Sequence, residues 1–66
     1  MRITPIQCRI ARLLAGLSLH RLAEESSVST GAITALEAGE TVPALEIYLI
    51  ESTLRKHGVR LDRGSR

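Results

Sequence analysis

The side chains that could do chemistry in this sequence are few and are scattered along the chain. The one cysteine, Cys8, has no second cysteine for a disulfide, and neither histidine lies in a cluster with metal-ligand spacing. No nucleophile is paired with a base, and there is no glycine-rich phosphate loop. A chain of 66 residues also offers little room for a substrate pocket. We therefore expect no enzyme, no metal and no cofactor.

Charge is the remaining chemistry, and it falls into blocks that the net charge of +2 conceals. Residues 1–21 contain four arginines and no acid, whereas residues 22–54 contain six glutamates and no base. Residues 55–66 are basic again, with five cations and one aspartate. Clustered cations are the electrostatic signature of nucleic-acid binding. A surface that neutralises phosphates would therefore have to come from the two ends of the chain.

The length allows one domain, near the lower limit at which a core is stable without a metal or disulfides. Help from a partner subunit is therefore plausible. No stretch approaches the roughly 20 apolar residues of a membrane-spanning helix, and the N-terminus lacks the apolar run of a signal peptide. We expect a soluble, cytoplasmic domain over residues 1–61 and a flexible tail over residues 62–66, with no membrane partner.

The first element is expected to be a helix over residues about 5–15. The run Thr4-Pro5-Ile6-Gln7 is a capping box with proline at the first helical position. Gly16 supplies the left-handed residue that ends the helix. Cys8 faces partly away from the apolar stripe and is expected to be a small packed or semi-exposed thiol. The stripe recurs at helical spacing and consists of Ile6, Ile10, Leu13, Leu14 and Leu17.

Two shorter helices are expected over residues about 19–26 and 30–38, joined by a turn of about three residues. Ser18 and Ser29 are their N-caps, and Gly39 ends the second. Both caps are flanked by apolar pairs spaced as hydrophobic staples, Leu17 with Leu22 and Val28 with Ile33. Residues suited to the inside of two steeply crossing helices are Ala23, Val28, Ile33 and Leu36. The spacing is typical of a helix-turn-helix unit, although it would suit any small helical hairpin.

A fourth helix is expected over residues about 44–57, between Pro43 and Gly58. Its apolar residues lie on two opposite faces. The face that can cover the core carries Ile47, Ile50 and Leu54. The face that needs a partner, and is expected to make a dimer contact, carries Leu45, Tyr48 and Leu49. Beyond it, Val59-Arg60-Leu61 alternates like a short strand.

Taken as a set, these features resemble one known family. The run RIARLLAGLSLHRLAEESSVSTGAITALEAGETVP, with LRKHGVRL after it, is similar to the Cro/C1-type, or XRE-type, helix-turn-helix regulators of bacteria and phages. The matching features are Arg12 four residues before Gly16, the runs GLS, LAE and VS, the ending Ile33-x-x-Leu36-Glu37-x-Gly39, and Pro43. The resemblance covers residues about 5–61. It implies an all-α, lambda-repressor-like bundle of four or five helices, with a short C-terminal strand as an option.

The resemblance also implies roles for individual residues. Arg12 is expected to form a structural ion pair with Glu37. The positions that read bases correspond to Ser29, Thr30, Gly31, Thr34 and Ala35, of which the first four are the predicted base contacts. Phosphate contacts are expected at the start of the second helix, from Ser18, His20 and Arg21, with Arg2 and Arg9 as further candidates. For each of these cations the alternative is a solvated surface charge.

The sequence departs from the family pattern on the surface that would meet DNA. Leu19 stands where the family often has a glutamine, and Ser27 stands in the turn where it often has glycine, so Ser27 has to adopt a left-handed conformation. Residues 27–40 contain no lysine, arginine, glutamine or asparagine, the side chains that make most bidentate base contacts. The loop after the third helix, often basic in the family, reads Glu40-Thr41-Val42. Phosphate neutralisation is correspondingly weaker.

Two functions remain open on the sequence. The first is a transcriptional regulator that binds a palindromic operator in double-stranded DNA as a homodimer, with the helix at about 30–38 in the major groove. The second is an adaptor or antiactivator that docks another transcription regulator through the acidic segment 22–54. The operator, the direction of regulation and the regulated pathway cannot be read from the residues.

Overall fold

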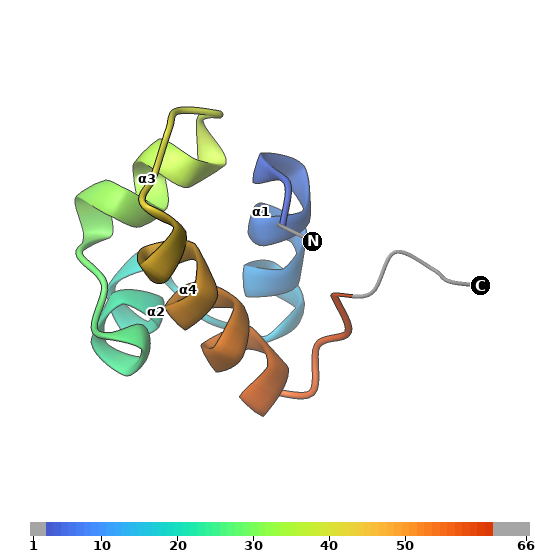
Figure 1. Ribbon diagram of the computed structural model, residues 1–66. Coiled ribbons are helices and arrows are strands. Elements are labelled where there is room, and N and C mark those ends of the chain that lie inside the picture. The colour runs from blue at the N-terminus through green and yellow to red at the C-terminus, as the bar shows by residue number, and fades with distance from the viewer. Residues whose placement is uncertain (1–2, 62–66) are drawn as a thin grey trace.

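The computed structural model describes residues 3–61 and contains four helices in that range (Figure 1). The helices are α1 (Pro5–Leu14), α2 (Leu19–Ser26), α3 (Thr30–Glu37) and α4 (Ala44–Lys56). This confirms the all-α bundle, and each helix begins and ends within one residue of its predicted bounds. No helix in the described part is both long and apolar enough to span a bilayer. The predicted tail 62–66 and the candidate phosphate contact Arg2 lie outside the described residues.

Side-chain caps account for where the first three helices begin. Thr4 Oγ1 accepts from the Gln7 backbone N–H at 3.1 Å, and Gln7 Oε1 accepts from the Thr4 N–H at 2.9 Å, which completes the predicted capping box. Ser18 Oγ accepts from the N–H of residue 21, and Ser29 Oγ from the N–H of residue 32, each at 3.1 Å. Each cap satisfies a backbone donor that the helix itself cannot satisfy.

The turn between α2 and α3 contains a non-glycine residue with a positive φ angle. Ser27 lies in the left-handed region, with φ 62° and ψ 28°, as the family resemblance implied from the glycine that often stands at this position. The neighbouring Ser26 is buried, and its hydroxyl accepts from the Val28 N–H at 3.3 Å. The left-handed conformation costs a non-glycine residue roughly 1 kcal/mol. The packing of α2 against α3 therefore maintains a turn that the serine does not itself prefer.

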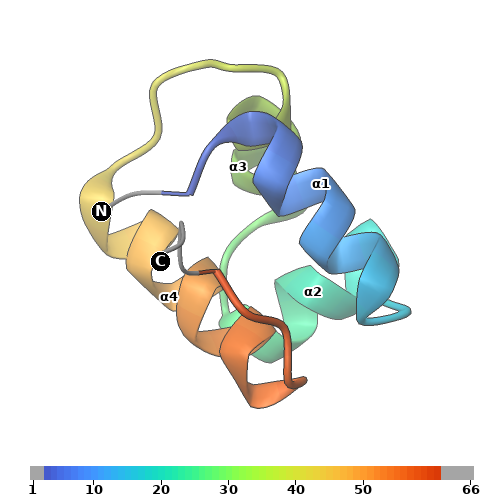
Figure 2. The ribbon, with the colours of Figure 1, turned by 90° about the vertical axis from the view of Figure 1, so that its right-hand side faces the viewer.

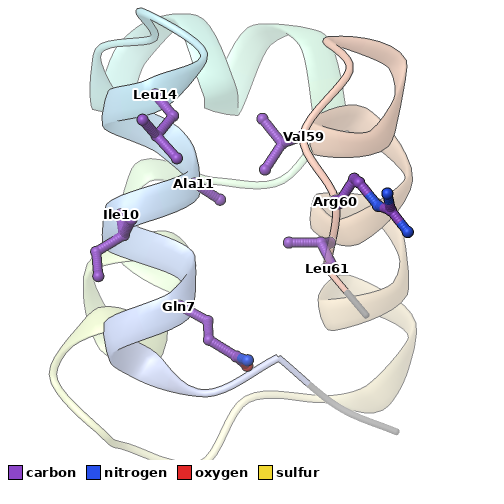
Figure 3. A pocket seen from close by; sticks show the side chains of 7 residues that line it. All are labelled: Gln7, Ile10, Ala11, Leu14, Val59, Arg60 and Leu61. Atoms are coloured by element: carbon purple, nitrogen blue, oxygen red, sulfur yellow. The ribbon is translucent and has the colours of Figure 1, made fainter. Parts of the chain in front are cut away.

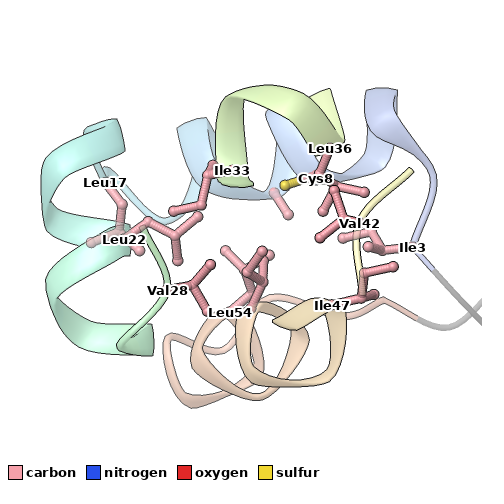
Figure 4. Packing of buried hydrophobic residues seen from close by; sticks show 12 residues of the cluster. Ile3, Cys8, Leu17, Leu22, Val28, Ile33, Leu36, Val42, Ile47 and Leu54 are labelled. Carbon is pink, nitrogen blue, oxygen red and sulfur yellow. The ribbon is translucent and has the colours of Figure 1, made fainter. Parts of the chain in front are cut away.

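Helix α3 is the centre of the bundle because it packs against each of the other three helices. The fully buried side chains lie between these helices and belong to Cys8, Leu22, Ile33, Ile50 and Leu54 (Figure 4). Both predicted staples lie in this core, and so does the predicted inner face of α4. The helix-turn-helix pair and α4 therefore enclose one apolar core.

Helix α1 is rotated relative to what its apolar stripe predicted. Ile6, Ile10, Leu13 and Leu14 are exposed, whereas Cys8 and Ala11 are buried; only Leu17, beyond the helix, enters the core. Cys8 is therefore a packed thiol that faces away from the stripe, as expected, whereas the expectation that the stripe itself is packed was wrong. Arg12 has to face α3 to reach Glu37, and Cys8 and Ala11 lie on the same side of the helix as Arg12. The ion pair thus fixes the rotation and leaves the large apolar residues outside.

The predicted C-terminal strand is also absent from the described residues. The Val59 backbone N–H donates to the Leu54 carbonyl at 3.2 Å. This hydrogen bond ends α4 and is not part of a β-ladder. Val59 and Leu61 are half-buried and pack against the core cluster. Their alternation reflects two side chains that turn towards the bundle, because the described part of the chain contains no neighbouring strand.

Glu51 on α4 is a buried acid that the apolar pattern did not single out. Its side chain accepts from the Ile3 backbone N–H at 2.8 Å. A buried carboxylate is costly unless it is hydrogen-bonded, and this contact supplies a bond. Glu51 therefore attaches the segment before α1 to α4 and helps to bury Ile3.

Candidate nucleic-acid interface

The predicted base contacts lie at the start and along the outer side of α3. Ser29, Gly31 and Thr34 are exposed, and Thr30 is half-buried. The Ser29 hydroxyl is already the N-cap acceptor, which leaves the threonine hydroxyls as the free polar groups of this surface. A Cβ on Gly31 would meet nothing closer than 3.9 Å, so the bundle itself does not require glycine there. The result is a shallow, small-residue surface that allows close approach.

The predicted phosphate contacts lie at the start of α2, and two of the three are already engaged within the protein. Ser18 Oγ is the cap acceptor, while His20 is exposed. The Arg21 guanidinium donates to Glu25 Oε2 at 2.9 Å, one turn further along the helix. Arg21 is therefore near the N-terminus of α2, where backbone N–H groups attract anions, but its charge is balanced by a neighbour.

Glu25 connects α2 to the end of α4 through His57. Glu25 Oε1 lies 2.6 Å from His57 Nε2, and the hydrogen bond with His57, followed by the one from Arg21, lowers the pKa of Glu25. Sequence reasoning missed this three-residue network. The spacing of Arg21 and Glu25 by four residues is a local signal for a helical ion pair, but the contact with His57 spans 32 residues and has none.

The ion pair between Arg12 and Glu37 is the most enclosed polar contact of the site. Arg12 Nε donates to Glu37 Oε2 at 2.9 Å and Nη2 donates to Oε1 at 3.2 Å, while Nη1 reaches the Leu17 carbonyl at 3.1 Å. The two side chains are only 12% and 11% exposed. This parallel geometry is the strongest that arginine makes with a carboxylate. It holds the C-terminal end of α3 against α1.

Cys8 lies beside this ion pair, and its thiol is unreactive. Its thiol donates to Glu37 Oε2 at 3.6 Å, and burial, together with the negative charge of Glu37, raises the pKa of Cys8 to about 12. Since the thiolate is the reactive form, a buried thiol with this pKa is a packing residue. The described residues also contain no group of three or more side chains suited to hold a metal ion.

The acidic middle segment is less acidic at its surface than its sequence indicates. Glu37 is paired with Arg12, Glu25 with Arg21 and His57, and Glu51 is buried against the Ile3 amide. Among the described residues, the glutamates without an ion pair or hydrogen bond are Glu24, Glu40 and Glu46. Half of the glutamates in segment 22–54 are therefore paired or hydrogen-bonded within the protein.

The comparison with known families agrees with this geometry. A family model described as helix-turn-helix matches residues 9–57, a stretch that begins within α1 and ends just after α4. No curated protein and no solved structure matches the chain. The matched stretch covers most of the sequence and all of the α2–turn–α3 unit, which supports a DNA-binding regulator rather than an enzyme. The chain therefore belongs to the Cro/C1-type (XRE) helix-turn-helix family.

Proposed function

We propose that the protein is a homodimeric transcriptional regulator that binds a roughly palindromic operator, with α3 in the major groove of double-stranded DNA. The observation that carries the proposal is the α2–turn–α3 unit within the matched stretch. In this unit Ser29, Gly31 and Thr34 are exposed at the start and on the outer side of α3, and the Ser29 hydroxyl is the N-cap acceptor. A dimer would place its two α3 helices about one helical turn of DNA apart, roughly 34 Å.

Recognition in this proposal depends on close approach rather than on long side chains. Thr30 and Thr34 each offer one hydroxyl and one methyl group, which give less discrimination than a bidentate pair. Gly31 leaves the surface open to the DNA backbone. The backbone N–H groups at the starts of α2 and α3 hold phosphates. Specificity then comes largely from DNA shape and from the spacing of the half-sites.

The dimer contact in this proposal includes the outer face of α4. Leu45 and Tyr48 are exposed, whereas Leu49 is half-buried against the core and forms the edge of that surface. Exposed large apolar residues on a small domain favour association with a partner. Dimerisation also doubles the number of phosphate contacts, which set most of the affinity for DNA.

The adaptor alternative has less support because its docking surface is reduced. Three of the six glutamates in segment 22–54 are paired or buried within the protein. Glu24, Glu40 and Glu46 remain as the acidic side chains that a basic partner could meet. The structure provides no further observation in favour of docking through this segment.

A mobility-shift titration tests the proposal, with DNA from upstream of the protein's own gene and a salt series. We expect a sequence-specific shift for the wild type that is lost in Thr34→Glu. The matched control is Ala44→Glu, which adds the same charge at the exposed first residue of α4 and should leave the shift intact. Absence of any sequence preference at low salt would refute operator binding.

A further inference from the structure

The side of α3 that points away from the core is made of small, uncharged side chains. It lies opposite the buried Ile33 and Leu36. At helical spacing this surface, here called the α3 face, consists of Thr30, Gly31, Thr34 and Ala35. Gly31 and Thr34 are its exposed members. Methyl groups, two hydroxyl groups and one bare Cα are therefore what the α3 face offers to a base.

The large apolar side chains of α1 do not lie beside the α3 face. Helix α1 turns Arg12 and Cys8 towards α3, so its exposed apolar residues point the other way. Two of them, Ile10 and Leu14, line a groove of about 120 Å³ between α1 and residues 59–61 (Figure 3). Residues 59–61 lie on the side of the bundle away from α3 (Figures 1 and 2). The groove therefore belongs to a different surface, and apolar contacts with a base have to come from α3 itself.

Each base presents different groups in the major groove, and the α3 face can recognise few of them. Guanine is read by arginine or lysine and adenine by asparagine or glutamine, and residues 27–40 contain none of these four residue types. Cytosine is read by a carboxylate, but the carboxylate of α3, on Glu37, is paired with Arg12. A threonine hydroxyl both donates and accepts, so it does not select one base. The specific contact that remains is an apolar one, between a threonine or alanine methyl group and the C5-methyl group of thymine.

Gly31 gives this short surface the close approach that a methyl contact requires. Two methyl carbons attract each other at roughly 3.5–4.0 Å, so side chains as short as these reach a base only if the helix backbone comes near it. A Cβ at position 31 would meet nothing closer than 3.9 Å, so the bundle does not require glycine there. Glycine at such a position lowers the stability of a helix. What it supplies is room next to Thr34, which lies three residues along the same side of α3.

We infer that each operator half-site carries a thymine beneath the α3 face and that the methyl group of Thr34 contacts its C5-methyl group. Thr34 is the exposed threonine of this face, whereas Thr30 is half-buried. The inference rests on the proposed DNA binding and names the base that α3 recognises. The contact distinguishes thymine from cytosine, which lacks the methyl group, and it adds a direct contact to the recognition of DNA shape.

Replacement of thymine by uracil in the DNA tests this contact, because uracil lacks only the C5-methyl group and keeps the hydrogen bonds to adenine. The probe is the shortest fragment from upstream of the gene that retains the specific mobility shift. Each thymine is replaced in turn, together with its equivalent in the other half-site. We expect one such pair of replacements to weaken wild-type binding by about tenfold, since each buried methyl group contributes about fourfold. This loss of affinity is here called the uracil penalty.

Three protein variants test whether Thr34 makes the contact. Thr34→Ser removes the side-chain methyl group and keeps the hydroxyl, so we expect the uracil penalty to disappear. Thr34→Val keeps a methyl group and removes the hydroxyl, so the penalty should remain. The matched control is Thr41→Ser, which makes the first change at an exposed threonine after α3 and should also leave the penalty in place. Circular dichroism confirms that the variants are folded.

The other outcomes overturn the inference, and they separate it from the proposed function. If the wild type binds specifically but shows no uracil penalty at any thymine, α3 does not read the methyl group, and operator binding stands. An equal penalty in the wild type and Thr34→Ser would come from DNA shape or from another side chain. A penalty that disappears in Thr34→Val and remains in Thr34→Ser would assign the contact to the hydroxyl. Absence of any specific shift by the wild type refutes operator binding, and the thymine contact with it.

Discussion

The α2–α3 pair and α1 use their apolar residues in opposite ways. In α2 and α3 the large apolar residues face inward, and Leu22 and Ile33 are fully buried. In α1 the large ones face outward, and the buried positions are small. An amphipathic pattern shows that a helix has an apolar face, but what covers that face depends on the rest of the fold. For α1, the position of Arg12 decides the rotation.

The largest expected difference between the two regions is in stability. Ile33→Ala creates a cavity in the core and should lower the free energy of unfolding by roughly 2–5 kcal/mol. Leu13→Ala removes a side chain that is 62% exposed and should change it by less than about 0.5 kcal/mol in the isolated subunit. Urea unfolding at low protein concentration measures both. A large loss for Leu13→Ala would show that α1 packs its leucines within the subunit.

The second prediction concerns the contact that sets the rotation of α1. Arg12→Ala leaves Glu37 without a partner in a largely enclosed site, and we expect a loss of roughly 2–3 kcal/mol, slightly below that for a fully buried pair. Arg9→Ala on the same helix is the control, because Arg9 is exposed and should contribute less than about 0.5 kcal/mol. If thermal or urea unfolding shows equal effects for the two substitutions, the ion pair is not what sets the rotation of α1.

Local sequence signals predicted most of this fold. The features that were not predicted depend on contacts between residues far apart in the sequence. Capping serines, the capping box and helix-ending glycines have effects within a few residues, so they give the helix ends to within one position. The place of the turn follows from the two capped helices around it, whereas the left-handed conformation of Ser27 was implied by the family resemblance. The orientation of α1 depends on a contact 25 residues away. The contact between Ile3 and Glu51 spans 48 residues. Neither could be read from a periodicity.

The candidate interface also has a part that local sequence signals predicted and a part that depends on long-range contacts. The positions of Ser29, Thr30, Gly31 and Thr34 at the start of α3 follow from the cap. The pairing of Arg21 with Glu25 follows from their spacing of four residues on one helix, whereas the contact of Glu25 with His57 follows only from the packing of α2 beside the end of α4. Contacts with bases and phosphates stay predictions, because they depend on the DNA that each side chain meets.

An effect that depends on pH comes from Cys8 on the buried side of α1. Its pKa is raised from an ordinary value of about 9 to about 12, so the folded protein keeps a proton that the unfolded chain releases in this window. The unfolded state then binds fewer protons, and stability falls as the pH rises from about 9 to 12, by at most about 1.4 kcal/mol per pH unit. Below pH 9 this contribution is fully present.

The matched control for the thiol is Cys8→Ser, which keeps a small side chain at the same position and does not titrate in this range. The two proteins share every other titrating group, so the difference between their urea midpoints isolates Cys8. We expect that difference to be constant below pH 9 and to change in favour of the variant above it. A constant difference up to pH 11 would show that the thiol ionises in the folded protein.

The smallest predicted effect is on DNA affinity and concerns the balance between Arg21 and Glu25. Glu25→Gln removes a negative charge and releases Arg21 from its charged partner, so operator binding at low salt should tighten by about three- to tenfold. The slope of log affinity against log salt should become steeper by about 0.9, the value for one additional phosphate contact. Glu24→Gln removes the same charge from an exposed neighbour that forms no salt bridge with Arg21. If both variants gain equally and neither changes the slope, the gain reflects net charge, and Arg21 makes no phosphate contact.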